Sequence, residues 1–184
     1  MAAAAGYAPR GAAYKKIRVA VLGTGHAHAL GKIQTLRSLP EYEFVGICRP
    51  DPDEPNEGDV FRGVRWLSME ELLDERAAIE LIDVESRVER NLQYAQKCVS
   101  AGKFVHLDKA PGEDLAGLQA LLAEASSRKR VVQMGYQWRY HPAMQAAIEP
   151  RGTVGWGASM PFAPPLTSLS RPMSGASWPS SAGV

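Results

Sequence analysis

Between Lys16 and Ile148, short apolar runs alternate with segments whose apolar residues recur every three or four positions. The short runs are rich in β-branched residues and predict strands, whereas the longer spacing predicts amphipathic helices. The predicted strands are Lys16–Leu22, Tyr42–Cys48, Val64–Leu67, Ile79–Val84, Phe104–Leu107 and Val131–Gly135. The predicted helices are His26–Ser38, a segment that begins after Ser68, Val88–Ala101, Asp114–Arg128 and Pro142–Ile148. This alternation predicts an α/β fold with a doubly wound parallel sheet of the Rossmann type.

Local signals support several of these boundaries. Ser68 and Glu71 have the spacing of a capping box, in which each side chain bonds the backbone amide of the other. Gly102 is a typical residue at the end of a helix, and Pro142 suits a first helical position. The segment Arg49–Gly63 has three prolines and no apolar period, so we expect a loop there.

Composition divides the chain into three parts. Residues 1–15 are rich in Ala and Gly and are expected to be a flexible leader. Residues 16–150 contain all the predicted elements and form the expected folded domain. Of the 34 residues from 151 to 184, 17 are Pro, Ser or Gly and none is acidic, so we expect a disordered tail.

The stretch from Lys16 to Leu30 has the pattern of a strand, a glycine turn and a helix. Gly23 and Gly25 flank Thr24 directly after the strand. Glycines allow close approach of the backbone to a pyrophosphate, and the following helix offers its free amides. The sequence therefore predicts a dinucleotide site that includes Gly23, Thr24 and Gly25; the alternative is a plain strand-to-helix turn.

Other polar residues also follow predicted strands. They are Gly23–His28, Arg49, Glu85–Arg87, Asp108–Pro111 and Tyr136–Arg139. In a doubly wound sheet, ligands bind outside the carboxyl ends of the strands, so these residues are expected at one site.

Arg49 stands 24 residues after Gly25, at the end of the second predicted strand. An acid at this place binds the ribose 2′-hydroxyl, whereas a guanidinium suits a 2′-phosphate. Arg49 therefore favours NADP over NAD; the alternative is a solvated loop arginine, with Asp51 on the ribose. Glu85 and Arg87 are expected to pair near the ribose.

His26 and His28 invite a metal interpretation. Residues two apart on a helix point to different faces, and no third ligand stands near them in the sequence. We therefore expect no metal and place both imidazoles beside the cofactor. Cys48 and Cys98 lie in apolar segments and are expected to be buried thiols of a reducing compartment.

Charge and hydropathy exclude several classes of partner. Residues 17–150 contain 16 Lys and Arg against 20 Asp and Glu, which is no footprint for nucleic acid. No apolar run reaches the roughly 20 residues that span a bilayer. The first residues lack the apolar core of a secretory signal, so we expect a cytoplasmic protein.

The order of these features resembles the N-terminal half of the glucose–fructose oxidoreductase and inositol dehydrogenase (Gfo/Idh/MocA) family. The runs that carry the resemblance are VLGTGHAHA, AGKFVHLDK and VVQMGYQWRYHPAM. The family joins a Rossmann domain to an α+β domain and mostly moves hydride between a nicotinamide and a sugar or polyol. The resemblance implies an NAD(P)-binding domain at residues 16–150.

The resemblance also implies roles for single residues. Lys109 matches the family lysine that faces the reacting hydroxyl and assists proton transfer, and Asp108 steadies its loop. Tyr136 and Arg139 match a segment near the nicotinamide. Trp138 and Tyr140 follow the same strand, where packing residues are the alternative.

The chain departs from the family pattern in three places. His28 replaces the third small residue of the glycine fingerprint, and the proline of the lysine motif comes one place late, at Pro111. Residues 151–184 contain no Asp, Glu or His, although the family's α+β domain supplies a substrate-facing Asp and His. We therefore expect the α+β domain to be absent and the chain to be truncated.

Three functions follow from this pattern. The first is an NAD(P)-dependent oxidoreductase of sugar-like alcohols; the second is a catalytically inactive nucleotide-binding remnant. A third is a module that pairs with a copy of itself through an exposed sheet face. The substrate, the direction of the reaction and the oligomeric state stay open.

Overall fold

The computed structural model describes residues 15–148. The chain divides into two compact units, residues 1–136 and 137–184, and each is described by itself. The predicted leader, apart from Lys15, and the predicted tail lie outside the described residues.

The first unit is a six-stranded parallel sheet with the order β3-β2-β1-β4-β5-β6. The strands are β1 (Ile17–Leu22), β2 (Tyr42–Cys48), β3 (Trp66–Leu67), β4 (Leu81–Val84), β5 (Phe104–Leu107) and β6 (Val132–Met134). The helices are α1 (Ala29–Ser38), α2 (Met69–Leu73), α3 (Val88–Ser100) and α4 (Leu115–Ser127), with 3-10 turns η1 (Asp59–Phe61) and η2 (Glu75–Ala77). The strand order confirms the predicted doubly wound sheet. Its direction of winding reverses between β1 and β4.

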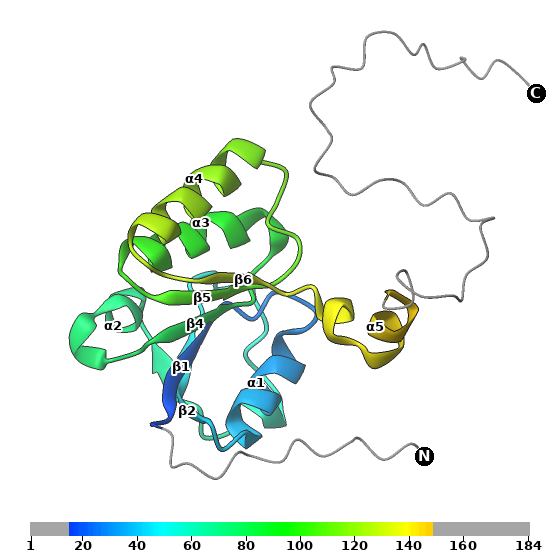
Figure 1. Ribbon diagram of the computed structural model, residues 1–184. Helices are drawn as coiled ribbons and strands as arrows, with labels where there is room; N and C mark the ends of the chain where they lie inside the picture. The colour runs from blue at the N-terminus through cyan, green and yellow to red at the C-terminus, as the bar shows by residue number, and fades with distance from the viewer. Residues whose placement is uncertain (1–14, 149–184) are drawn as a thin grey trace, which may run out of the picture. The chain divides into compact units, whose positions relative to one another are not determined.

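Helices cover both faces of the sheet (Figure 1). Val19 and Val21 of β1 pack against Ile33 of α1, whereas Ala20 and Leu22 belong to the cluster on the other face. These four residues of β1, Val19–Leu22, are fully buried. The unbroken apolar run of β1 therefore has a direct cause, because each side of the strand meets a helix.

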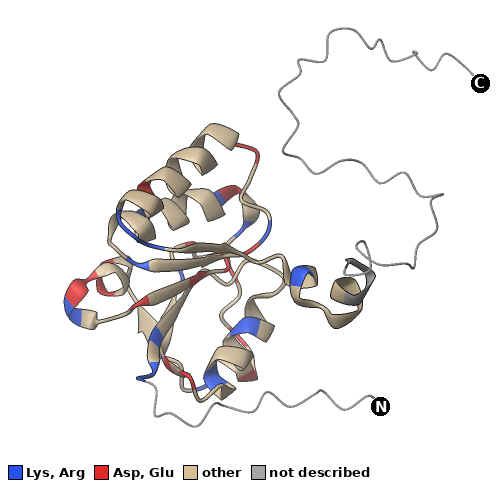
Figure 2. Cartoon of the chain, viewed as in Figure 1, with Lys and Arg blue, Asp and Glu red and all other residues tan. Residues whose placement is uncertain are grey.

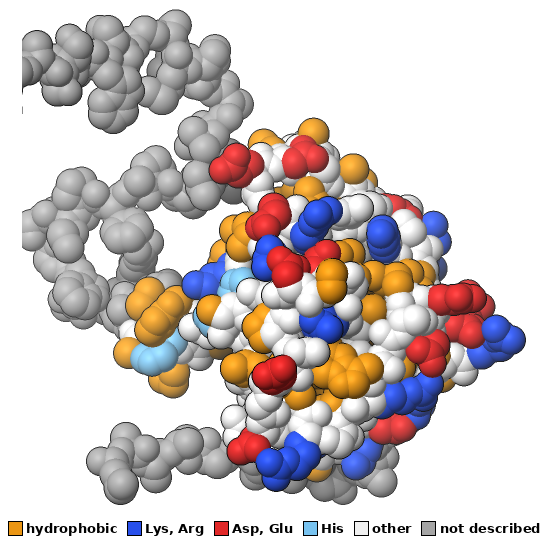
Figure 3. Space-filling model, turned by 180° about the vertical axis from the view of Figure 1, so that it is seen from behind, with side chains coloured by type: hydrophobic (Ala, Val, Ile, Leu, Met, Phe, Trp, Pro, Cys, Tyr) orange, Lys and Arg blue, Asp and Glu red, His pale blue; other side chains and the backbone are white. Residues whose placement is uncertain are grey.

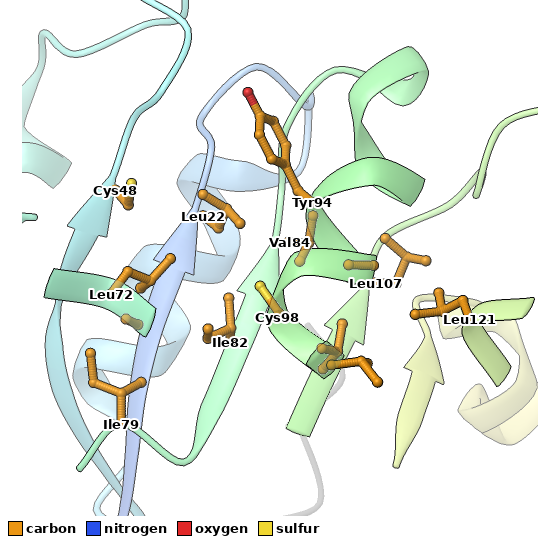
Figure 4. Packing of buried hydrophobic residues seen from close by; sticks show 14 of the residues in the cluster. Leu22, Cys48, Leu72, Ile79, Ile82, Val84, Tyr94, Cys98, Leu107 and Leu121 are labelled. Carbon is orange, nitrogen blue, oxygen red and sulfur yellow. The ribbon is translucent and has the colours of Figure 1, made fainter. Parts of the chain in front are cut away.

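The larger core lies on the face that α3 covers. Figure 4 shows Ile82 and Val84 of β4 and Leu107 of β5 beside Cys98 and Tyr94 of α3. Cys98 is fully buried and Cys48 nearly so, and both are free thiols, as the sequence predicted.

Element boundaries agree with the sequence analysis to within a few residues. The capping box is confirmed, because Ser68 Oγ accepts from the Glu71 amide at 3.0 Å and Glu71 Oε2 accepts from the Ser68 amide at 2.8 Å. Helix α1 begins three residues later than predicted. The His26 amide instead donates to the Glu85 carbonyl at 2.9 Å, which fixes the turn before the helix.

The predicted loop after β2 contains one short element. The turn η1 places Phe61 in the cluster under α1, where the side chain is 6% exposed. The buried ring of Phe61 therefore fixes the end of the loop, although the loop sequence has no hydrophobic periodicity that predicts it.

The surface of the first unit carries charges of both signs. Segments with Lys or Arg and segments with Asp or Glu are scattered over its helices and loops (Figure 2). The face seen from behind shows the same mixture beside scattered apolar side chains (Figure 3). Among the described residues, no helix has the length and hydropathy that a bilayer crossing requires.

The described part of the second unit contains the turn η3 (Gln137–Tyr140) and the helix α5 (Pro142–Ile148). The rings of Trp138 and His141 lie 5.2 Å apart within it. The helix begins at Pro142, as predicted.

Ile82 provides a test of the core. Its side chain is fully buried at the centre of the sheet, where Ile82 pairs with Ala20 of β1 and Val105 of β5. Ile82→Ala is expected to lower the free energy of unfolding by about 2–5 kcal/mol, because it leaves a cavity. Urea titration followed by circular dichroism measures this loss. Leu115→Ala, at a side chain that is 66% exposed, is the control, and an equal loss there would contradict the assignment of the core.

Candidate functional site

The carboxyl ends of β1, β4 and β5 meet in one row. The Glu85 amide donates to the Leu22 carbonyl at 2.9 Å, and the Asp108 amide donates to the Val84 carbonyl at 3.2 Å. These bonds extend the parallel ladder by one residue on each strand. Gly23, Glu85 and Asp108 therefore follow three neighbouring strands at the same level.

The glycine turn is packed so closely against its neighbours that no side chain would fit at Gly23 or Gly25. Gly23 has φ of +86°, and a Cβ on it would lie 2.6 Å from Ser86 Cα. A Cβ on Gly25 would lie 2.7 Å from Glu54 Oε1 and 3.2 Å from the Arg87 amide nitrogen. The turn leads into α1, whose N-cap residue His28 makes no side-chain bond to the helix amides. Both glycines are therefore required by geometry, and no side chain caps the first turn of α1.

A buried cluster of charges lies beside this turn, with Lys32 of α1 at its centre. The ammonium is 2.8 Å from Glu85 Oε1 and 3.8 Å from both Asp83 Oδ1 and Asp108 Oδ2. The three acids are at most 3% exposed. Burial lowers the pKa of Lys32, but the facing carboxylates outweigh this and raise it above its ordinary value. Lys32 is therefore held as a cation.

Three histidines complete the cluster. His28 Nδ1 lies 2.9 Å and His26 Nδ1 3.3 Å from Asp108 Oδ2, and His106 Nδ1 lies 2.6 Å from Asp83 Oδ1. Burial lowers the pKa of His26, although Asp108 partly opposes the effect. The imidazoles therefore share the buried carboxylates with Lys32.

Glu85 is the most perturbed member of the cluster. Burial and the nearby Asp83 raise its pKa to about 9, and Lys32 only partly opposes them. Its Oε2 has no hydrogen-bond partner among the described residues and lies 3.6 Å from His26 Nδ1. Asp108 differs: burial raises its pKa, but the Lys109 amide, Lys32 and His28 together hold it below its ordinary value. At neutral pH Glu85 therefore carries a proton and Asp108 does not.

A third potential ligand does lie near the two histidines in the folded chain, although none is near them in the sequence, so the prediction was wrong on this point. His26, His28 and Asp108 offer ligand atoms within 4.8 Å of one another. The Lys32 ammonium already faces the same Asp108 oxygen, and His26 Nδ1 accepts from the His28 amide at 3.1 Å. These contacts give the three residues a hydrogen-bonding role, and we assign no metal to them.

Arg49 lies at the end of β2, as expected, but its guanidinium is engaged in its own loop. Nη1 donates to the carbonyls of Pro52 at 2.6 Å and Glu54 at 2.8 Å. Asp51, the alternative ribose ligand, accepts from the Tyr94 hydroxyl at 3.0 Å. The side chains of Arg49 and Asp51 are therefore both engaged in contacts that stabilise the loop after β2.

The expected Glu85–Arg87 pair does not form. Glu85 is buried against Lys32, whereas Arg87 Nη2 lies 2.5 Å from Asp53 Oδ2 on the surface. Both residues lie beyond the end of β4, and Arg87 is already the N-cap residue of α3, so its side chain leaves the face on which Glu85 meets Lys32 of α1.

The remaining predicted residues lie at the ends of β5 and β6. The Lys109 amide donates to Asp108 Oδ1 at 2.6 Å, and its side chain is half-buried. Tyr136 ends the first unit with its side chain 52% exposed. Arg139 belongs to the second unit, where its carbonyl accepts from Gln145 Nε2 at 3.4 Å.

Sequence reasoning missed Lys32, Asp83, His106 and Glu54. A signal for two of them exists in the strands, because Asp83 and His106 each stand two residues before an acid of the site, on the same face of neighbouring strands. Lys32 is one helical turn after His28. Glu54 comes from the loop, which has no period to interpret.

The proton on Glu85 predicts how stability depends on pH. Its folded pKa of about 9 lies above its ordinary value of 4.5, so the folded chain keeps a proton that the unfolded chain releases. The free energy of unfolding is therefore expected to fall between pH 7 and 8.5, on the order of 1 kcal/mol per pH unit. This window lies above the lowered titration of His26 and below that of Lys32.

Glu85→Gln is expected to remove most of this slope, since Gln carries no titrating proton. Urea titrations at pH 7 and 8.5 measure it, with Glu113→Gln on the exposed surface as the control. The same slope in wild type and Glu85→Gln would contradict the raised pKa.

Comparison with known proteins agrees with this geometry. Residues 17–136 match the Gfo/Idh/MocA family model, which is described as an oxidoreductase family with an NAD-binding Rossmann fold. No match is found among the curated proteins.

Solved structures of the same fold cover most of the described chain. The D-galactose-1-dehydrogenase of Rhizobium etli is 24% identical with a TM-score of 0.62, over 74% of this chain and 42% of its own. The myo-inositol 2-dehydrogenase of Lactobacillus plantarum is 18% identical with a TM-score of 0.61, over 72% and 40%. A Synechocystis biliverdin reductase, solved with biliverdin and NADP⁺, is 21% identical with a TM-score of 0.62, over 76% and 44%.

The chain spans less than half of the length of each of these structures. They share its fold. The family model, in contrast, covers about two thirds of the chain itself and includes the glycine turn, the charged cluster and Lys109. The chain therefore belongs to the Gfo/Idh/MocA oxidoreductase family and contains its NAD-binding Rossmann domain.

Proposed function

We propose that this chain binds NADP or NAD at the glycine turn and serves an oxidoreductase that acts on the CH–OH group of a sugar-like or polyol substrate. The observation that carries the proposal is the turn at the point where the winding of the sheet reverses. Gly23 and Gly25 admit no Cβ there, and no side chain caps the start of α1. This is where a doubly wound sheet binds a dinucleotide.

The residues present fit such a cofactor. A dinucleotide needs backbone donors for its pyrophosphate, and the amides of Thr24, Gly25 and the start of α1 supply them. Arg49 at the end of β2 suits a 2′-phosphate, which favours NADP, although its guanidinium must then leave part of its loop contacts. Glu85, Asp108 and Tyr136 are proposed to line the rest of the cofactor site, and Arg139 is proposed as a cofactor residue from the family resemblance alone.

The bound nicotinamide would supply the hydride acceptor or donor. Lys109 is proposed to hold or release the proton of the substrate hydroxyl at Nζ. Its neighbour Asp108 bonds the Lys109 amide and so fixes the start of the loop that carries the lysine. His28 Nδ1 lies 2.9 Å from the Asp108 carboxylate on the other side, so the backbone at Lys109 is oriented by a residue of the proposed cofactor site.

The substrate class is proposed from the family and from its sugar- and polyol-oxidising members. Two of the similar structures are named as galactose and inositol dehydrogenases.

We propose a cytoplasmic location, because burial raises the pKa of Cys48 to about 11 and that of Cys98 to about 12, which suits reduced thiols.

Dinucleotide binding is tested by titrating NADPH and NADH and following nicotinamide fluorescence. Saturation is expected with both, and tighter with NADPH. Gly25→Val is expected to abolish binding, because its side chain meets Glu54 and the Arg87 backbone. Arg49→Ala is expected to remove the preference for NADPH, about 1–3 kcal/mol for a lost charged bond. Absence of saturation with either cofactor in the wild type would sink the proposal.

Turnover separates an enzyme from a binding remnant. Wild type is assayed with a panel of polyols and aldoses and NADP⁺ at saturation. Lys109→Ala is expected to lower kcat about 10²–10⁴-fold, because general acid–base help is lost, with cofactor affinity unchanged. Binding of NADPH with no turnover on any substrate would favour the nucleotide-binding remnant.

A further inference from the structure

Glu54 lies directly on the glycine turn. Its side chain comes from the loop after β2, and Oε2 accepts from the Thr24 amide at 2.9 Å. Oε1 sits 2.7 Å from the place of a Cβ on Gly25 and has no hydrogen-bond partner among the described residues. Glu54 is 2% exposed. A carboxylate of the chain itself therefore fills the backbone cradle of the turn.

The loop that carries Glu54 is tied down on several sides. The Thr24 hydroxyl donates to the Pro55 carbonyl, and Arg49 donates to the Glu54 carbonyl at 2.8 Å. Asp53 pairs with Arg87 at the start of α3, and Asp51 accepts from Tyr94. These contacts hold residues 51–55 against the turn from both the β1 and the α3 sides.

The position of Glu54 is electrostatically costly. Burial raises its pKa, and Asp51 adds to this, while the amides of Thr24, Arg87 and Gly25 lower it. A second anion cannot share these amides, because two negative charges a few ångströms apart in a buried place repel strongly.

We propose that Glu54 is an internal competitor for the pyrophosphate of the dinucleotide. In the free chain its carboxylate stands in for a phosphate on the glycine turn, and cofactor binding requires residues 51–55 to move away. The inference rests on the proposed dinucleotide site. It makes the loop after β2 a cover whose opening sets the apparent affinity.

The two functions of a glutamate at this place predict opposite results. If Glu54 held the ribose hydroxyls, its loss would weaken binding. If it competes with the pyrophosphate, its loss tightens binding of any ligand that has a pyrophosphate. When the covered state holds about nine tenths of the molecules, removal of the competitor tightens the apparent Kd about tenfold.

The experiment measures binding of NADPH, ADP-ribose and adenosine by isothermal titration calorimetry to wild type, Glu54→Gln and Glu54→Ala. Glu54→Gln keeps a carbonyl that accepts from the Thr24 amide and removes the charge, so it stays informative if Glu54→Ala does not fold. Glu57→Gln, an exposed acid of the same loop, is the matched control. Hydrogen exchange at the Thr24 amide of the free chain is the second readout.

Both Glu54 variants are expected to bind NADPH and ADP-ribose about tenfold more tightly, with adenosine and Glu57→Gln unchanged, and Glu54→Ala to exchange the Thr24 amide faster. Unchanged or weaker binding by Glu54→Gln while wild type binds NADPH overturns the competitor and leaves the dinucleotide site standing. Equal tightening in Glu57→Gln overturns it as well, since general charge would then explain the gain. Binding of NADPH by no variant overturns the dinucleotide site and the competitor together.

Discussion

Strand β1 is the constraint on which the site depends. It pairs with β2 on one side and β4 on the other, and its residues Val19–Leu22 are closed to solvent on both faces. No slip by one residue is tolerated, because Val19 and Ala20 would exchange faces between clusters built for different shapes. The register fixes where β1 ends, and with it the level at which Gly23, Glu85 and Asp108 meet.

Burying charged side chains at the carboxyl ends of the strands costs desolvation free energy. The cluster offsets part of this cost because its carboxylates share one ammonium. One ammonium, from Lys32, faces three carboxylates, and the shortage of positive charge is met by a proton on Glu85. An ion pair of this depth gives little net stability. Its effect is geometric instead, because the same Asp108 that faces Lys32 also bonds the Lys109 amide. The charges thus connect α1 to the loop after β5.

The fold was predictable because its signals are periodic. The apolar runs and helical spacing gave the sheet, and the Ser68–Glu71 spacing gave a cap that the structure confirms. The site was predictable only where it follows strand ends. The Glu85–Arg87 pairing failed because the chain turns from the end of β4 into α3 between the two residues, so that Glu85 faces Lys32 whereas Arg87 faces Asp53. The carboxylate beside the histidines was missed because Asp108 is 80 residues from His28 in the sequence.

Glu54 shows why the loop was beyond sequence reasoning and why it matters. The loop has three prolines and several acids but no hydrophobic periodicity, so the sequence does not indicate which side chains are buried. Only the structure shows that the side chain of one acid, Glu54, points inward. Backbone amides that bind phosphate do not distinguish it from a carboxylate, since both present oxygen acceptors with negative charge. A glycine turn strong enough to hold a dinucleotide therefore also attracts any acid that the neighbouring loop brings near. Arg49 holds the carbonyls of that loop, so the residue proposed to favour a 2′-phosphate also holds the segment that carries the proposed competitor.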